Sequence, residues 1–312
     1  MTNENAYPVP TDDAVYLDHI GHFVPDLDAA SDVLERMGFA LTPFSLHINT
    51  DDPNVEPKPA GTANRLIMLD EGYLEILGAV GEVGDETPVA QQLLAQMERY
   101  VGVHLVAMCC ADAEEQRKRL VDAGFPIGPA VDLRRDTEDA DGNPDLVTFT
   151  VIRPRPGAMK EGRIQFLRHN RPDLMWQQRW MTHANGAQAL TDIVICVADM
   201  DEADDRFRRY LDRSSEAIAD GRLFRFERGG IALLDEGGFA AALPGTELPT
   251  VPFIAGYGLR SGDLGATKAH LEANGFTPRE LGSGAVVVDA PAALGGTFVF
   301  TARDMAPPWR AS

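Results

Sequence analysis

The chain has 312 residues and a formal net charge of −20 at pH 7, from 28 Lys and Arg against 48 Asp and Glu. A surface of this sign repels nucleic acid and favours cationic or neutral ligands, although local arginines can still hold an anion. The length suffices for about two domains, and no stretch reaches the roughly 18 apolar residues of a membrane span, so a soluble protein without nucleic-acid or membrane partners is expected.

The N-terminal residues 1–13, MTNENAYPVPTDD, carry neither a basic start nor an apolar run. They are therefore not expected to form a secretory signal, and the cytoplasm is the predicted location. Three cysteines in this length predict buried, reduced thiols and no disulfide framework.

Four segments repeat one pattern of a short apolar strand, an acidic residue and a helix. They are LDHIGHFVPDLDAASDVLERMGF (17–39), GVHLVAMCCADAEEQRKRLVDAGF (102–125), LTDIVICVADMDEADDRFRRYLDR (190–213) and IAGYGLRSGDLGATKAHLEANGF (254–276). The acidic residues near the helix starts are Asp26, Asp112, Asp199 and Asp263. A carboxylate there accepts from free backbone N–H groups, so all four are predicted to be helix caps.

Further strand-like runs follow each helix, most clearly in RLIMLDEGYLEILGA (65–79), where Asp70, Glu71 and Gly72 form a turn between two apolar runs. The pattern predicts an α+β protein of four tandem βαβββ modules. A polar, turn-rich stretch, QQRWMTHANGAQ (177–188), separates the second module from the third. We expect one pair of modules over 14–178 and another over 188–305.

This order of elements, together with LDHIGHFVPDLDAA, GTANRLIMLDEGYLEILG and GVHLVAMCCAD, resembles the vicinal oxygen chelate superfamily of glyoxalases, bleomycin resistance proteins and extradiol dioxygenases, and in particular its glyoxalase-like branch. The resemblance covers nearly the whole chain as architecture, and its residue-level marks lie in the first half. It implies that modules pair into half-barrels around a pocket, and that the first and last strands of each module supply metal ligands.

Strand alternation separates the two histidines of the first strand. His19 shares a face with Gly21 and Phe23, whereas His22 shares one with the apolar residues that a helix should cover. The family's first-strand ligand matches His19, and His22 is interpreted as a packed or hydrogen-bonded core residue. In the last strand of the module, Glu75 interrupts an apolar run and matches the family's last-strand ligand.

In the second module, His104 aligns with His19 and Gln165 aligns with Glu75. The resemblance therefore implies a metal site of His19, Glu75 and His104, with Gln165 as a weak ligand or an outer group. Such a set suits iron, manganese, nickel, zinc or cobalt, and the donors do not choose among these divalent ions. If the first module pairs with the fourth, His104 leaves the site, and His47 is the first substitute.

The third and fourth modules do not repeat these groups. Asp192 stands at the place of His19 and Leu233 at that of Glu75, and the fourth module offers Ala255 or Gly256. The second pair is therefore expected to be metal-free, and to cover the open side of the first pair or to form a homodimer contact.

Two polar segments complete the set of candidates. Residues 45–65 are interpreted as a long irregular connection beside the pocket, with His47, Asn64 and Arg65 either contacting substrate or holding the loop's own backbone. Residues 134–145 loosely resemble a calcium loop but lack its glycine and glutamate, so a polar hairpin tip is expected.

Three functions follow from this interpretation. The first is a metal-dependent glyoxalase-like enzyme with lyase or isomerase chemistry on a small molecule, in which Glu75 and Gln165 are catalytic. An amide at Gln165 cannot take a proton, so Glu75 would have to serve as base. The alternatives are an Fe(II) ring-cleaving dioxygenase and a metal-free drug-sequestering protein.

Overall fold

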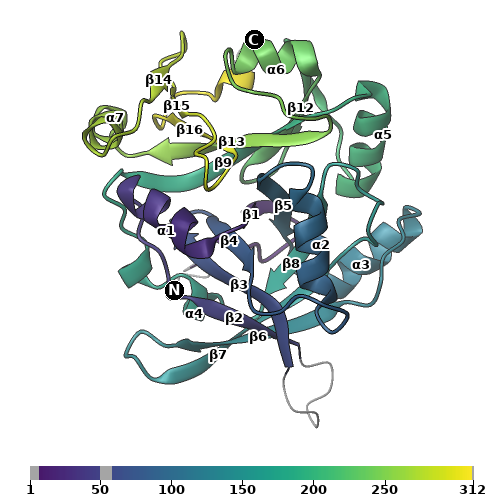
Figure 1. The fold of residues 1–312 in the computed structure, drawn as a ribbon. Coiled ribbons are helices and arrows are strands. Elements are labelled where there is room, and N and C mark those ends of the chain that lie inside the picture. Colours follow the sequence, from purple (N-terminus) through teal and green to yellow (C-terminus); the bar gives the residue numbers. More distant parts are fainter. Residues whose placement is uncertain (1–6, 50–57, 311–312) are drawn as a thin grey trace, which may run out of the picture.

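Two mixed eight-stranded sheets, A and B, form the framework of the protein (Figure 1). The computed structural model describes residues 7–49 and 58–310. Both sheets have the same topology, since each places the first strand of one module beside the first strand of the next. Within the described ranges, no helix combines the length and the apolar character that a bilayer crossing requires.

Sheet A is built by the first two modules and has the strand order β2-β3-β4-β1-β5-β8-β7-β6. Its elements are β1 (Tyr16–Val24), α1 (Leu27–Arg36), β2 (Ser45–Asn49), β3 (Lys58–Met68), β4 (Tyr73–Ala79), α2 (Pro88–Met97), β5 (Gly102–Cys109), α3 (Ala113–Asp122), β6 (Val131–Glu138), β7 (Pro144–Ile152) and β8 (Arg163–His169), followed by α4 (Pro172–Met175) and the 3₁₀ turn η1 (Gln178–Trp180).

Sheet B is built by the last two modules and has the order β10-β11-β12-β9-β13-β16-β15-β14. Its elements are β9 (Ala187–Cys196), α5 (Met200–Leu211), β10 (Glu216–Ile218), β11 (Gly221–Arg225), β12 (Gly230–Leu234), α6 (Glu236–Ala242), β13 (Phe253–Ser261), α7 (Leu264–Ala273), β14 (Arg279–Glu280), β15 (Val286–Val288), β16 (Thr297–Thr301) and the 3₁₀ turn η2 (Pro308–Arg310).

The first module pairs with the second, because β1 runs antiparallel to β5 while β4 and β8 lie parallel on their outer sides. The predicted class, α+β with four βαβββ modules in two paired half-barrels, is confirmed. The predicted caps are also found: each of the four aspartates accepts from a backbone N–H in the first turn of its helix. These caps satisfy donors that the helix itself leaves free.

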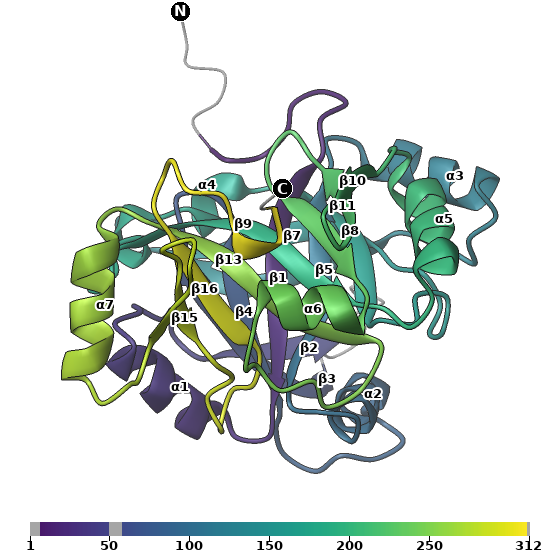
Figure 2. The ribbon, with the colours of Figure 1, turned by 90° about the horizontal axis from the view of Figure 1, so that it is seen from above.

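The two sheets pack against each other around a shared apolar core. In the view from above, β9 and β13 of sheet B cross β1 and β5 of sheet A, with α1 and α7 on one side and α3 and α5 on the other (Figure 2). Residues from both sheets, such as Ile20, Val106, Ile193 and Phe298, belong to this core. His22 lies within it, where its Nδ1 is 3.1 Å from the Leu294 carbonyl and its Nε2 is 2.9 Å from the Tyr257 hydroxyl. As expected, His22 is a hydrogen-bonded core residue.

The outer face of sheet B is filled with apolar side chains. Phe239 of α6 and Trp309 of η2 pack there against the strands, and Asp192 forms an ion pair with Arg310. Burial raises the pKa of Asp192 to about 6, although Arg310 opposes that shift. The position equivalent to His19 is therefore enclosed by the C-terminal part of the chain.

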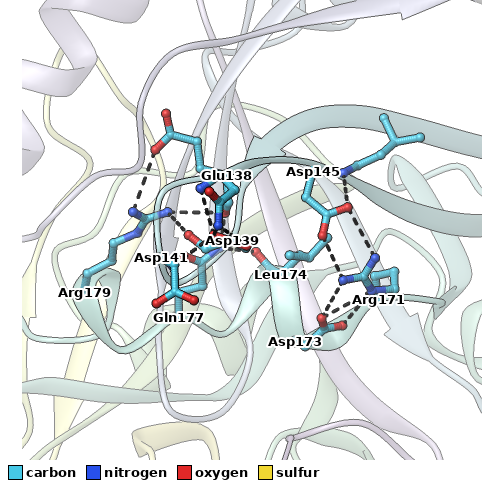
Figure 3. Close-up of polar contacts among 11 residues, drawn as sticks. Glu138, Asp139, Asp141, Asp145, Arg171, Asp173, Leu174, Gln177 and Arg179 are labelled. Carbon is cyan, nitrogen blue, oxygen red and sulfur yellow. Dashed lines mark hydrogen bonds and ion pairs between the residues drawn. The ribbon is translucent and has the colours of Figure 1, made fainter.

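The β6–β7 hairpin ends in the predicted polar tip, which is tied to the chain that leaves sheet A (Figure 3). Asp139 accepts hydrogen bonds from the backbone of Asp141 and Asn143. Gln177 and Arg179 donate to carbonyl groups at the end of β6. Nearby, Arg171 pairs with both Asp145 and Asp173. These contacts tie the β6–β7 hairpin to the segment that follows β8.

Two buried histidines predict how the stability of the fold depends on pH. Burial lowers the pKa of His22 and of His104 to about 4, so both are neutral at pH 7. Between pH 6.5 and pH 4 the unfolded chain binds protons at these residues and the folded chain does not. The free energy of unfolding should therefore fall as the pH falls through this window, by up to roughly 3 kcal/mol for each histidine. Urea denaturation at pH 7, 5.5 and 4.5 measures this.

The matched variant is His22→Asn, which keeps a polar group and removes the titration. Its unfolding free energy should depend less steeply on pH than that of the wild type, whatever its absolute stability. His270→Asn, a partly exposed site on α7, serves as the control. Equal slopes for His22→Asn and the wild type would contradict the account.

Candidate functional site

The concave face of sheet A forms an open cup of about 970 Å³, its mouth included. Small-molecule sites are concave and largely apolar with a few polar groups, and this cup has that character. Apolar side chains such as Leu77, Leu105 and Leu167 cover much of the floor. Polar groups stand at cup-facing positions of strands that are otherwise apolar, and the two most central are His19 on β1 and Glu75 on β4.

His19 and Glu75 approach each other at the floor of the cup. The Nε2 atom of His19 lies 4.0 Å from Oε2 of Glu75. The ring of Tyr73 stacks on the His19 imidazole with 4.3 Å between centroids, and Asn64 donates from Nδ2 to Oε1 of Glu75 over 2.6 Å. Burial alone would raise the pKa of Glu75, but His19, His47, Asn64 and Arg135 outweigh it and lower the pKa. Glu75 is therefore an oriented carboxylate, ionised at neutral pH.

A fully buried aspartate behind the floor fixes the orientation of His19. Asp18 lies 2.6 Å from Nδ1 of His19 through Oδ2 and 2.9 Å from Nε2 of His169 through Oδ1. Burial would raise the pKa of Asp18, but His169 and His19 together bring it well below its usual range. An ionised carboxylate only accepts hydrogen bonds, so both imidazoles donate to it. In the neutral ring the lone pair is then on Nε2 of His19, the nitrogen that faces the cup.

His47 and Gln165 also line the cup, as their assignment to the site requires. His47 Nδ1 is 3.0 Å from the Thr62 hydroxyl, and burial lowers the pKa of His47, so its ring is neutral at pH 7. Gln165 is 4% exposed, and its Oε1 has no hydrogen-bond partner in the part of the chain that the structure describes. A buried acceptor without a partner is costly, which makes this oxygen a site for a ligand atom.

His104 does not join the other predicted ligands, because β5 contains a bulge. Gly21 pairs with Leu105 and His22 pairs with Val103, so His104 is the extra residue. Its ring stacks on Tyr100, and its Nε2 is 2.8 Å from the Tyr100 carbonyl. The corresponding bulge on β1 falls at Asp18, since Leu17 and His19 pair with successive residues of β5.

The two bulges explain why the sequence pattern wrongly matched His104 with His19. By the symmetry of the modules, His104 corresponds to Asp18, and Leu105 corresponds to His19. Leu105 therefore occupies the cup position at which the sequence predicted a second histidine, and His104 is buried outside the cup.

The segment 45–65 differs from the expected irregular loop. Its first residues form β2 and its last residues form most of β3, and the two strands pair; residues 50–57 lie outside the described residues. Asn64 faces the cup. Arg65 is the next residue along β3 and therefore points to the other face of the sheet, where its Nη1 lies 4.0 Å from Oε1 of Glu35 in α1. The structure thus places His47 and Asn64 at the site and Arg65 away from it.

Four arginines line the cup, from the strands of the second module and the residue that follows β7. They are Arg134, Arg135, Arg153 and Arg163, and Glu75 is the one acidic residue of the lining among the described residues. Burial lowers the pKa of Arg135, Arg153 and Arg163, that of Arg163 to about 10, so all three remain cations at pH 7. The net charge of −20 therefore does not describe the cup, whose local charge is positive.

Two groups of side chains bring together atoms that could bind a metal ion. Asp18, Cys109 and His169 lie close together, with ligand atoms within 4.8 Å of one another. Both oxygens of Asp18 are already engaged, however, and burial raises the pKa of Cys109 well above its usual value, which keeps the thiol protonated. The carboxylate of that cluster is therefore occupied and its thiol is protonated, and the cluster serves to orient His19.

The cup offers the better arrangement. Two ligands at about 2.1 Å from one ion lie roughly 3 to 4 Å apart, as Nε2 of His19 and Oε2 of Glu75 do. Gln165 supplies a further free oxygen. Gly21 leaves room beside them, since a Cβ there would lie 3.5 Å from Oε2 of Glu75. The donors fit a divalent ion, with one histidine fewer than predicted.

The chain resembles known proteins both in sequence and in fold. A family described as "Glyoxalase-like domain" matches residues 17–211, more than half of the chain. The match runs through sheet A and ends with α5 of the third module. No curated protein matches the sequence.

Several solved structures share the two-sheet architecture at low sequence identity. A hypothetical protein from Staphylococcus aureus has a TM-score of 0.59 at 13% identity, covering 92% of this chain and 99% of its own. A variant of 4-hydroxymandelate synthase from Streptomyces coelicolor has 0.55 at 13%, covering 95% and 94%. A Mn(II)-bound glyoxalase from Novosphingobium aromaticivorans has 0.53 at 12%, covering 93% and 82%. At such identities the likeness concerns the fold.

The substitution Asp18→Asn tests the buried hydrogen bonds behind His19. An amide cannot accept from both imidazoles as a carboxylate does, so one ring must change tautomer or lose its partner. We expect a loss of about 1–3 kcal/mol in the free energy of unfolding, together with a change in the tautomer of His19 or of His169 seen in long-range ¹⁵N–¹H NMR spectra. Asp26→Asn, the same change at an exposed helix cap, should leave stability and tautomers unaltered. Wild-type stability together with unchanged tautomers of both His19 and His169 in Asp18→Asn would refute this arrangement.

Proposed function

Because this chain belongs to the glyoxalase-like domain family of the vicinal oxygen chelate superfamily, we propose that the cup of sheet A is the active site of an enzyme for a small oxygenated molecule, with a divalent metal ion held by His19 and Glu75. The observation that carries the proposal is the 4.0 Å approach of His19 Nε2 to Glu75 Oε2 at the floor of an open cup. The Mn(II)-bound glyoxalase with the same fold is consistent with it.

The side chains around the ion would have distinct roles. When bound, the ion would supply Lewis acidity to two neighbouring substrate oxygens. Asp18 holds the His19 ring with its lone pair toward the cup, and Asn64 holds Glu75 through Oε1 while leaving Oε2 free. The free oxygen of Gln165 is placed to complete the donor set or to accept a hydrogen bond from substrate.

Proton transfer in this proposal falls to His47. Its neutral ring lines the cup, and neutral imidazole is an effective base near pH 7. The amide of Gln165 cannot take a proton, and the lowered pKa of Glu75 makes that carboxylate a weak base. Abstraction of a proton beside a carbonyl, with lyase or isomerase chemistry, is the reaction class that these groups support.

An Fe(II) ring-cleaving dioxygenase is the second candidate, because the superfamily to which the chain belongs includes extradiol dioxygenases. Non-haem Fe(II) oxygenases use two histidines and one carboxylate. Leu105 stands where the second histidine would be, so the donor set favours the lyase or isomerase over the dioxygenase. A drug-sequestering protein for cations is disfavoured by the arginines of the cup.

Metal binding by the purified protein tests the proposal. We expect about one divalent ion per chain, measured by elemental analysis after equilibrium dialysis against Mn(II), Fe(II), Co(II), Ni(II) or Zn(II). His19→Ala removes a ligand and Glu75→Gln replaces the charged carboxylate by a neutral amide, and each should weaken binding by more than the roughly 10- to 100-fold typical of losing an outer partner.

Two histidine variants outside the cup serve as controls. His104→Asn and His270→Ala should retain the ion with wild-type affinity, with folding checked by circular dichroism. Stoichiometric metal retained by both His19→Ala and Glu75→Gln, or lost only in His104→Asn, would refute the ligand assignment.

A further inference from the structure

Three guanidinium groups of the cup, those of Arg135, Arg153 and Arg163, form no ion pair with a carboxylate of the described residues. Glu75 acts on all three only from beyond ion-pair distance. Arg135 donates to the Asn64 amide oxygen and toward the sulfur of Met175. The Nε atom of Arg153 is buried without a hydrogen-bond partner, and Arg163 lies over the ring of Phe23 at 5.5 Å.

Such an arrangement is costly for the protein alone. Partly buried cations that face one another repel, and proteins normally pair a desolvated charge with an opposite one. Glu75 contributes one negative charge to the whole lining. An anionic ligand in the cup would supply the counter-charge that the described residues do not provide.

The strand register places Arg163 three strands away from the proposed metal ligand Glu75. Glu75 pairs with Gly21, Gly21 with Leu105, and Leu105 with Arg163, so these residues form one row across four neighbouring strands. At roughly 4.8 Å per strand, the Cα atoms of Glu75 and Arg163 are separated by about 14 Å along the sheet. The side chains of Glu75 and Arg163 both extend into this distance, so the space left between them is that of a small molecule lying across the floor.

The floor between the two ends is apolar. Leu77, Leu105, Val151 and Leu167 belong to one cluster under the cup, and Phe149 packs against it. A ligand lying here would bury an apolar body, while its charged group reaches the arginines.

We propose that the ligand of this cup is a small organic oxyanion, a carboxylate or a phosphate ester, whose charged group is held by Arg153 and Arg163 and whose apolar body lies on Leu105. The planar guanidinium matches such groups through paired hydrogen bonds. That the oxygens at the other end react beside His19 and Glu75 rests on the proposed function; the anion binding itself does not. The anion also offsets the repulsion between the arginines and a cation at His19.

A series of ligands with one ring and different charges tests the proposal. Benzoate, phenyl phosphate, benzyl alcohol and benzylammonium are titrated into the chelator-treated full-length protein by calorimetry at about 0.15 M salt, where charges beyond roughly 8 Å are screened. Benzoate or phenyl phosphate should bind at least tenfold more tightly than the alcohol and the ammonium ion. The better of the two anions identifies the charged group.

Arginine variants locate the binding. Arg153→Met and Arg163→Met keep an apolar stem and should each weaken the anion by roughly 10- to 100-fold. Arg168→Met, on the exposed side of β8, should leave the affinity unchanged. Without ligand, Arg163→Met should melt at or above the wild-type temperature, because it removes an unpaired charge, whereas a purely structural arginine would lower the melting temperature.

The outcomes separate this inference from the proposed function. Tighter binding of benzylammonium or benzyl alcohol than of both anions, no binding of either anion, or equal anion binding by the wild type and both arginine variants would overturn it. Anion binding that depends on the arginines, in a protein that takes up no metal at His19, would support it while refuting the metal-dependent function.

Discussion

The antiparallel pairing of β1 with β5 is the constraint on which the rest of the structure depends. It joins two modules into one continuous sheet, and it aligns Glu75, Gly21, Leu105 and Arg163 in a single row. Because side chains alternate along each strand, the register of this one ladder decides which residues face the cup. A bulge in each strand then shifts one residue out of alternation, and these residues are Asp18 and His104.

The bulge at Asp18 has a chemical consequence. It buries a carboxylate directly beside the histidine that faces the cup, so that the two consecutive residues act as orienting group and donor. His169, from the last strand of the second module, holds the other oxygen of Asp18. The inner floor of the site thus depends on both modules, although the two proposed metal ligands come from the first alone. The charges of the cup are divided between the modules, since the first carries Glu75 and the second carries the arginines.

Much of this could be predicted from the sequence. The repeat of strand, aspartate cap and helix was enough for the four modules, and an acid in an apolar strand marked Glu75. Alternation separated His19 from His22 correctly. His104 was misplaced because a bulge changes the register by one residue without leaving any sign in the apolar pattern. Arg65 was misplaced because the segment around it was interpreted as a loop, whereas β3 begins earlier and gives Arg65 and Asn64 opposite faces.

The arginines of the cup were missed for a different reason. The total charge of −20 describes the outer surface, whereas a pocket is governed by the few charges within a Debye length of it. A signal did exist, since Arg163 lies two residues before Gln165 and therefore shares its face. The rule that singled out Glu75, a charged residue in an apolar strand, applies equally to Arg163.

Anomalous diffraction from crystals grown with Mn(II) locates a bound ion without requiring a substrate, and it therefore shows whether His19 and Glu75 hold a metal. We expect one manganese peak in the cup of sheet A, within about 2.5 Å of both Nε2 of His19 and Oε2 of Glu75. A peak at the buried cluster of Asp18, Cys109 and His169, or no peak in the cup at saturating Mn(II), would contradict it.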